Sequence, residues 1–300
     1  MLSPIAGLTT TPPGYKFSRR ALAYLKISMS CRHSKARILT VHSTRSLIMN
    51  QRALPTSLML VSTAINAALY AGVGALWTAF PLTAFGVRFW PQVFVPAAFA
   101  VLFGPWSGGV GAAIGIFLAD VIYGHHDALL SLLVGVPSNF LGFFIIGWLT
   151  RSDHHGITRR VLLMVSLVIP IVLAGYGAFS LSGTGFTSPQ FLVALIGLVC
   201  VLCILGFALL QNRWADFEVA SSIGLGVGSI VIGAGIVLYS YIFALPAVLG
   251  LGSNGLPVTF MYSATAFTYL SEIPFLVLLT PPVIAACRTA FPSLGLKPRG

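Results

Sequence analysis

The sequence predicts an all-α integral membrane protein, a helical bundle of about eight transmembrane helices, and three observations support this fold class. First, 57% of the 300 residues are hydrophobic and only 8% are charged, whereas soluble domains carry about 25% charged residues. Second, the apolar stretches are continuous and lack the alternation of a transmembrane β-barrel. Third, backbone polar groups in lipid must be satisfied within their own segment, which favours helices for continuous apolar spans.

Eight apolar segments approach or exceed the length that crosses a bilayer, about 20 residues. They are 57–80, 89–104, 107–124, 128–150, 160–182, 190–211, 219–243 and 261–286. The second and third segments lie at the short limit, and Gly104, Pro105 and Trp106 separate them. Because Gly and Pro interrupt regular structure, we expect a helical hairpin here instead of one long helix.

The distribution of basic residues orients the bundle, since Lys and Arg gather on the cytoplasmic side. With a cytoplasmic N-terminus, the inner segments hold 16 of the 17 Lys and Arg, and only Arg88 falls outside. Eight spans then leave both termini in the cytoplasm of a multi-pass protein of the cell (plasma) membrane. If one of the short spans is re-entrant, the later part of this topology inverts.

Residues 1–48 differ from the rest, with eight Lys or Arg, no acidic residue and many Ser and Thr. Three interpretations are open: a disordered basic arm at an anionic membrane surface, a transit-like segment, or a stretch upstream of a true start at Met49. We favour the last, because the sequence after Met49 leads directly into the first span. Residues 49–300 form the predicted transmembrane domain.

Small residues line one face of the first predicted span. Ala64, Ala68, Ala71 and Ala75 are spaced by 4, 3 and 4 residues, which places them on one side of a helix. Small residues allow membrane helices to approach closely. Two interpretations remain open, namely packing inside the bundle and a docking surface for the helices of a partner.

Polar and aromatic residues in or beside the spans are candidates for a solute site, because polar groups are costly in a membrane. In the orientation above they gather in the outer half, as expected for an apolar pocket with a few convergent polar groups. The candidate substrate-binding residues are Arg88, Trp90, Gln92, Asp120, Tyr123, Asn139, Asn254, Tyr262 and Glu272.

Structural roles are also open for several of these residues. Trp90 suits the aromatic belt at a membrane interface, and Asp120 suits an ion pair with Arg88. Asn139 and Glu272 are harder to explain structurally. An amide and an acid at depth need partners, and a bound polar solute is one such partner.

Three stretches then support a resemblance to a known family. The alanine-faced first span is followed by "VPAAFAVLFGPWSGGVGAAIGIFLADVI" and by "SLLVGVPSNFLGFFIIGWL". In these features residues 57–150 resemble the substrate-binding S component of an energy-coupling factor (ECF) transporter. The stretch "LSEIPFLVLLTPPVIAA" is similar to the last helix of that family.

The resemblance implies a prokaryotic protein that captures a vitamin or similar micronutrient outside the cell. It also implies docking on a T subunit driven by two cytoplasmic ATPases, through the alanine face. The loop after the first helix, with Arg88 and Trp90, would cover the pocket. Because the family usually has six helices, the eight spans correspond to an S-component-like core of six plus an extra pair, the fifth and sixth.

The function expected is therefore solute capture for uptake, without enzymatic activity in this chain. The P-loop pattern G-x-x-x-x-G-K-[ST] does not occur in the sequence, so ATP hydrolysis would belong to the partners. The alternative is an integral membrane sensory module. An intramembrane enzyme is a weaker alternative, because no H-E-x-x-H site or nucleophile with a paired base is visible. We expect no metal, cofactor or nucleic-acid partner.

Overall fold

A computed structural model describes most of the chain after Leu54, and it is built almost entirely of helices. The described residues are 55–77, 82–123, 128–152, 157–182, 191–192, 195–199, 201–202, 214–246, 251 and 255–291. The predicted extension 1–48, the proposed start at Met49 and most of the predicted span 190–211 lie outside these residues.

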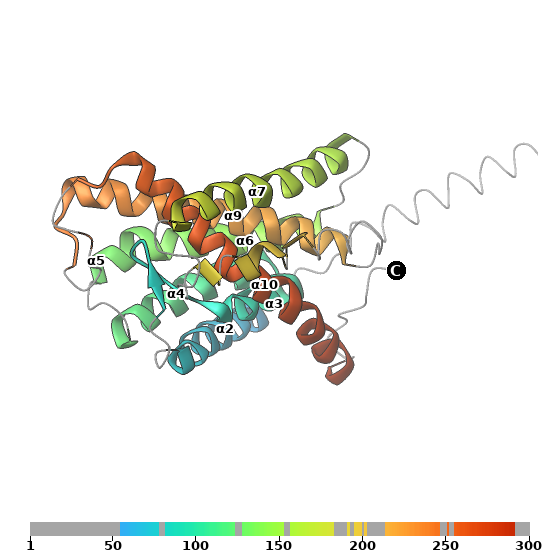
Figure 1. The fold of residues 1–300 in the computed structure, drawn as a ribbon. Coiled ribbons are helices and arrows are strands. Elements are labelled where there is room, and N and C mark those ends of the chain that lie inside the picture. The colour runs from blue at the N-terminus through green and yellow to red at the C-terminus, as the bar shows by residue number, and fades with distance from the viewer. Residues whose placement is uncertain are drawn as a thin grey trace, which may run out of the picture. The chain divides into compact units, whose positions relative to one another are not determined.

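Six helices in the described residues are long and apolar enough to cross a membrane, which supports the predicted multi-pass membrane protein (Figure 1). The long helices are α2 (Thr56–Trp77), α4 (Pro105–Tyr123), α6 (Val136–Arg151), which continues α5 and η2, α7 (Ile157–Ser182), α9 (Ala215–Ile242) and α10 (Val258–Ala290). The short elements are β1 (Thr83–Ala84), β2 (Val87–Arg88), the 3₁₀ turn η1 (Pro91–Val93), α3 (Phe94–Phe103), α5 (Ala128–Leu130) and the π-helical turn η2 (Ser131–Gly135).

The segment 89–104, expected as the second span, holds a shorter helix than the sequence suggested. Helix α3 has ten residues and rises about 15 Å, half of the roughly 30 Å of a hydrocarbon core. The expected turn is present, because Gly104 adopts φ 111° between α3 and α4, a conformation that glycine accommodates readily. The helical hairpin therefore exists, but one of its arms is short.

The small residues of α4 pack inside the bundle. A Cβ on Gly115 would lie 2.9 Å from the Ala67 carbonyl oxygen and 3.0 Å from the Tyr70 side chain, both on α2. Nearby, Asn66 Nδ2 donates a hydrogen bond to the Ser107 carbonyl oxygen at 2.9 Å. Close backbone contact and interhelical hydrogen bonds hold helices together in lipid, so Gly115 has a structural role in the packing of α4 on α2.

The second half of the bundle is built from α6, α9 and α10. Helix α9 packs against both α6 and α10. Helix α7 contacts α9 and α10 and lies along one edge of the bundle (Figure 1). Of the six candidate spans it buries the smallest share of its most apolar stretch, 22%. Helix α7 is thus peripheral, whereas α6 and α10 reach the interior in which the candidate site lies.

Candidate functional site

The loop after α2 folds back as a small β-hairpin, with β1 paired antiparallel to β2. Phe85 and Gly86 form its turn with φ angles of 54° and 70°, as a two-residue hairpin turn requires. The Phe85 ring packs edge-on against Phe260 and Phe267 of α10, with ring centroids 5.8 and 6.5 Å apart. These aromatic contacts seat the hairpin on α10 and fix the position of Arg88, its last residue.

Arg88 and Trp90 reach one hollow from the hairpin and the segment after it. Arg88 Nη1 donates to the Tyr123 carbonyl oxygen at 3.3 Å, which ties the hairpin to the end of α4. Trp90 is only 6% exposed, and its ring meets Tyr70 edge-on with centroids 6.4 Å apart. Since a belt residue faces the lipid interface, the burial of Trp90 favours a place in the wall of the site.

Hydrogen bonds to two other elements, α2 and η2, hold Asn139 in place. Tyr70 Oη of α2 donates to Asn139 Oδ1 at 2.8 Å. Asn139 Nδ2 donates to the Gly135 carbonyl oxygen at 2.9 Å, and Ser138 Oγ donates to the same oxygen at 2.8 Å. The partners that this amide needs at depth are therefore supplied by the protein itself.

Asp120, near the end of α4, is positioned by the π-helical turn η2. Ser131 Oγ donates to Asp120 Oδ2 at 2.6 Å. In the described part of the chain, Asp120 and Arg88 do not form the ion pair that the sequence suggested. The hydrogen-bond donor to the Asp120 carboxyl group is the hydroxyl of Ser131. Single π-helical turns frequently occur at functional sites, and here the turn brings Ser131 to the carboxyl group.

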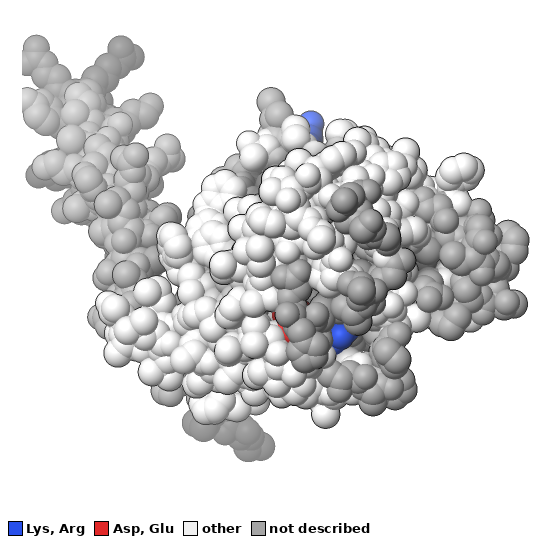
Figure 2. All heavy atoms as spheres, turned by 90° about the vertical axis from the view of Figure 1, so that its left-hand side faces the viewer, with Lys and Arg blue, Asp and Glu red and all other residues white. Residues whose placement is uncertain are grey.

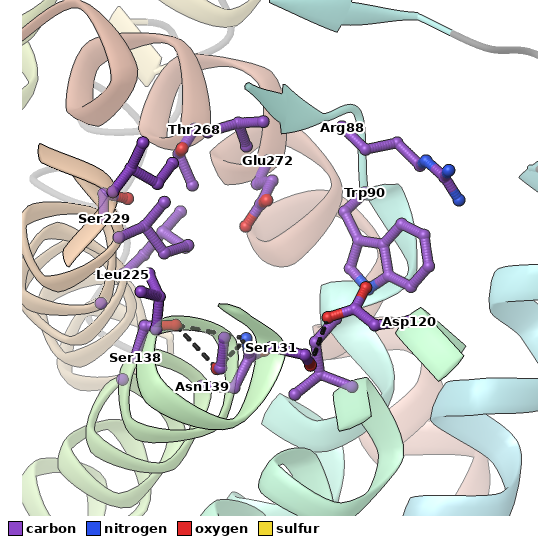
Figure 3. Close-up of a pocket in the computed structure, with 18 of the residues that line it drawn as sticks. Arg88, Trp90, Asp120, Ser131, Ser138, Asn139, Leu225, Ser229, Thr268 and Glu272 are labelled. Carbon is purple, nitrogen blue, oxygen red and sulfur yellow. Dashed lines mark hydrogen bonds between the residues drawn. The ribbon is translucent and has the colours of Figure 1, made fainter. Parts of the chain in front are cut away.

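Glu272 projects from the middle of α10 into the same hollow (Figure 3). The side chain is 6% exposed. Among the described residues, no hydrogen bond or ion pair engages its carboxyl group. Because an unpartnered ionised carboxylate is costly at membrane depth, this group needs a proton or a cationic partner.

Together these side chains surround a cavity of about 130 Å³. Its walls are mainly apolar, and they come from the hairpin, η2 and the helices α2, α4, α6, α9 and α10. On the face of the bundle at the α5 end, few of the described residues are charged, and a small red area of Asp or Glu is visible in a recess (Figure 2). The arrangement is that of a small-molecule site, apolar with a few placed polar groups.

The structure brings five of the nine predicted substrate-binding residues to this cavity. They are Arg88, Trp90, Asp120, Asn139 and Glu272. These five residues lie on five separate elements or loops, so their spacing in the sequence does not reveal their proximity.

The other four predicted residues do not join them. Gln92 is fully buried, but its side chain turns toward α2, where a Cβ on Gly74 would lie 3.0 Å from Gln92 Nε2. Tyr123 is exposed and meets Arg88 through its backbone only. Tyr262 is exposed and packs against Tyr176, with centroids 5.5 Å apart. Asn254 lies outside the described residues.

Several cavity residues were not selected from the sequence, among them Tyr70, Ser131, Ser229 and Thr268. The sequence could have indicated Tyr70, because this residue follows Asn66 by four positions and so continues one polar face of the first helix. The sequence contains no comparable indication for Ser131, since the position of this residue depends on the π-helical turn.

The four candidate docking alanines differ in exposure along α2. Ala64 and Ala68 are exposed, Ala75 is half-buried and Ala71 is buried at 6%. Helix α2 packs against α4, α3 and η1, and burial removes Ala71 from the surface that a partner can touch. The exposed row continues instead through Gly72, where an added Cβ would meet no atom within 4 Å.

No family model, curated protein or solved structure matches this chain. In the stretches that the structure describes, no three His, Cys, Asp or Glu side chains come together as metal ligands would. The chemistry of the site is therefore inferred from the residues that surround the cavity.

Proposed function

We propose that this chain is the solute-binding component of an ECF-type importer. It captures a vitamin-like or other small micronutrient outside the cell and docks on a T subunit with two cytoplasmic ATPases. The observation that carries the proposal is the cavity of about 130 Å³ inside a helical bundle, onto which the carboxyl of Glu272 opens without a protein partner. Apolar walls with few polar groups suit a small organic solute.

The charge distribution supports an outward-facing cavity. Arg88 is the one basic residue that the positive-inside rule places outside, and Arg88 lines the cavity. Arg151, at the far end of α6, falls on the cytoplasmic side in this orientation. A solute would enter beside the β-hairpin, which is seated on α10 through Phe85.

The exposed small residues of α2 supply a docking surface for the T subunit. Ala64, Ala68 and Gly72 follow one another at intervals of four residues, on the outside of the bundle. Such a row lets a partner helix approach the backbone closely. ATP hydrolysis belongs to the partner ATPases, because this chain carries no P-loop pattern.

A membrane pull-down from the native host tests the proposal. The tagged chain is expected to recover a T-type membrane subunit and ATPases, identified by mass spectrometry. Ala64→Trp with Ala68→Trp should abolish recovery, because two indoles on an exposed row prevent close helix approach. The matched control is Val168→Trp, which adds the same bulk to an exposed position of the peripheral helix α7 and should leave recovery unchanged.

Each outcome of the pull-down separates the alternatives. Recovery of the chain alone, in mild detergent, would contradict the ECF-type importer and favour the sensory module or a solitary transporter. Recovery of the same partners by the double Trp variant would keep the importer and reject the alanine row as its docking surface. Equal loss in the Val168→Trp control would reject the alanine row as well, because the effect would not be specific to α2.

A further inference from the structure

The carboxyl of Glu272 lines the cavity and has no hydrogen-bond or ion-pair partner among the described residues. Asp120 accepts from Ser131, Asn139 is hydrogen-bonded to Tyr70, and Arg88 donates to a backbone carbonyl. The hydroxyl of Ser229 also lacks a partner, but this atom is sealed within the wall. Only the Glu272 carboxyl, among these described groups, is both unpartnered and directed into the cavity (Figure 3).

The charges around the cavity favour a positive occupant. Two carboxyl groups, Asp120 and Glu272, line it, against the single cation Arg88. The guanidinium of Arg88 is partly engaged with the Tyr123 carbonyl oxygen. An anionic ligand would therefore give neither carboxyl group a positive partner, whereas a cation can pair with an ionised carboxylate, and this attraction is strengthened in a low-dielectric interior.

The aromatic groups and the size of the cavity point in the same direction. Trp90, Tyr70 and Phe143 all line the cavity, and aromatic rings attract organic cations, with Trp the most effective. The volume of about 130 Å³ is close to that of a cavity of about 150 Å³ that holds one benzene molecule. Apolar walls suit an organic body, whereas hard metal ions require about six or more oxygen ligands.

We propose that the cavity selects a small organic cation, a protonated amine or heterocyclic cation of about one ring, whose charge is met by the carboxylate of Glu272. In this arrangement Asp120 adds a second carboxyl group to the cavity wall, and Trp90 lies beside the organic body. The inference rests on the proposed function only in treating the bound cation as the transported solute; the binding site itself stands on the geometry.

A binding series with matched shapes and different charges tests this selectivity. The purified full chain in lipid nanodiscs is titrated with benzylamine and N-methylpyridinium as cations, benzyl alcohol as the neutral probe, and benzoate and nicotinate as anions. Binding is followed by calorimetry and by Trp fluorescence. At least one cation should bind about tenfold or more tightly than every neutral or anionic probe.

A matched pair of variants tests the role of Glu272. Glu272→Gln should weaken cation binding about tenfold or more while leaving the thermal unfolding profile cooperative. Glu218→Gln is the control, because Glu218 is also 6% exposed but does not line the cavity; its cation affinity should equal that of the unmodified chain. Unchanged cation affinity in folded Glu272→Gln would overturn the assignment.

The series in the unmodified chain decides the charge class even if Glu272→Gln does not fold. Anion binding as tight as cation binding would overturn the inference, and so would the absence of cation binding up to about 10 mM. The importer proposal is tested by a different result, the recovery of ATPases in the pull-down. ATPases recovered by a chain that prefers anions would keep the importer and reject the cation. Cation binding by a chain that recovers no ATPase would keep the site and reject the importer.

Discussion

Tyr70 shows how one side chain joins a helix to the cavity wall. Its ring is fully buried between Trp90 and Phe143, with edge-on contacts at 6.4 and 6.1 Å. Its hydroxyl donates to Asn139 Oδ1 at 2.8 Å. The ring and the hydroxyl thus hold two other cavity residues in place, and an unpaired buried amide oxygen would remain if the hydroxyl were removed.

Tyr70→Phe is therefore expected to lower the free energy of unfolding by about 1–3 kcal/mol, since it leaves a buried acceptor without its donor. Unfolding of the purified chain in detergent, followed by circular dichroism, measures the change. Tyr262→Phe is the control, because Tyr262 is 48% exposed and its hydroxyl loss should change stability little. Equal stability of Tyr70→Phe and the unmodified chain would show that this hydrogen bond is not formed.

Asp120 and Glu272 both carry carboxyl groups, but their different surroundings predict different contributions to the affinity for a cation. Asp120 already accepts a hydrogen bond from Ser131 at 2.6 Å. Glu272 has no such partner among the described residues. Asp120→Asn should accordingly reduce the affinity for benzylamine, but by a smaller factor than Glu272→Gln. A larger factor for Asp120→Asn in the same titration would reverse the roles given to the two residues.

At the scale of elements, the contact between α2 and α4 illustrates how small residues act in a membrane bundle. Gly115 lies so close to α2 that an added Cβ would come within 2.9 Å of the Ala67 carbonyl oxygen. The backbone of α2 cannot yield as a flexible side chain does, so a larger residue forces the helices apart. Gly72, on the outer side of the same helix α2, has no atom within 4 Å of its Cβ position.

Gly115→Val should accordingly destabilise the bundle by about 1–3 kcal/mol through overpacking. Gly72→Ala, in the open position, should leave stability unchanged or raise it slightly, because alanine favours helix more than glycine does. The same detergent unfolding assay compares the two variants. Similar stabilities for Gly115→Val and Gly72→Ala would contradict the close contact between α2 and α4.

The whole molecule carries its cavity at one end of a bundle of apolar helices. The hairpin and the π-helical turn both lie at that end, because both line the cavity. Asn139 and Arg151 belong to one helix, and twelve residues of α-helix separate them by about 18 Å. In the orientation that we propose from the positive-inside rule, the hairpin end is outside and the Arg151 end is cytoplasmic.

Cysteine labelling tests this orientation. In a background without native cysteines, Thr83→Cys on the hairpin should react with a membrane-impermeant maleimide in intact cells. Thr158→Cys, exposed at the start of α7, should react only after the membrane is opened. The reversed pattern would place the cavity opening in the cytoplasm and remove the basis for capture from outside.

The sequence by itself determined the helical membrane class, the turn at Gly104 and the helical segments that form α2, α4, α6, α7, α9 and α10. These features follow from local composition, because a continuous apolar run in lipid has few alternatives to a helix. The half-length of α3 was not predicted, since an apolar segment does not show whether it faces lipid or lies inside protein.

Only the tertiary structure decided which polar residues meet. Arg88, Asp120 and Glu272 come from β2, α4 and α10, and their convergence depends on helix rotation and on the seating of Phe85 against α10. Side-chain direction also could not be predicted for Gln92, which lies two residues from Trp90 but turns toward α2 and away from the cavity. The same limit applies to the alanine row, where shared spacing predicted one face and packing by neighbouring elements left Ala64 and Ala68 exposed but buried Ala71. Residue type and spacing set the chemistry that is available, whereas packing across elements decides which groups remain without a partner.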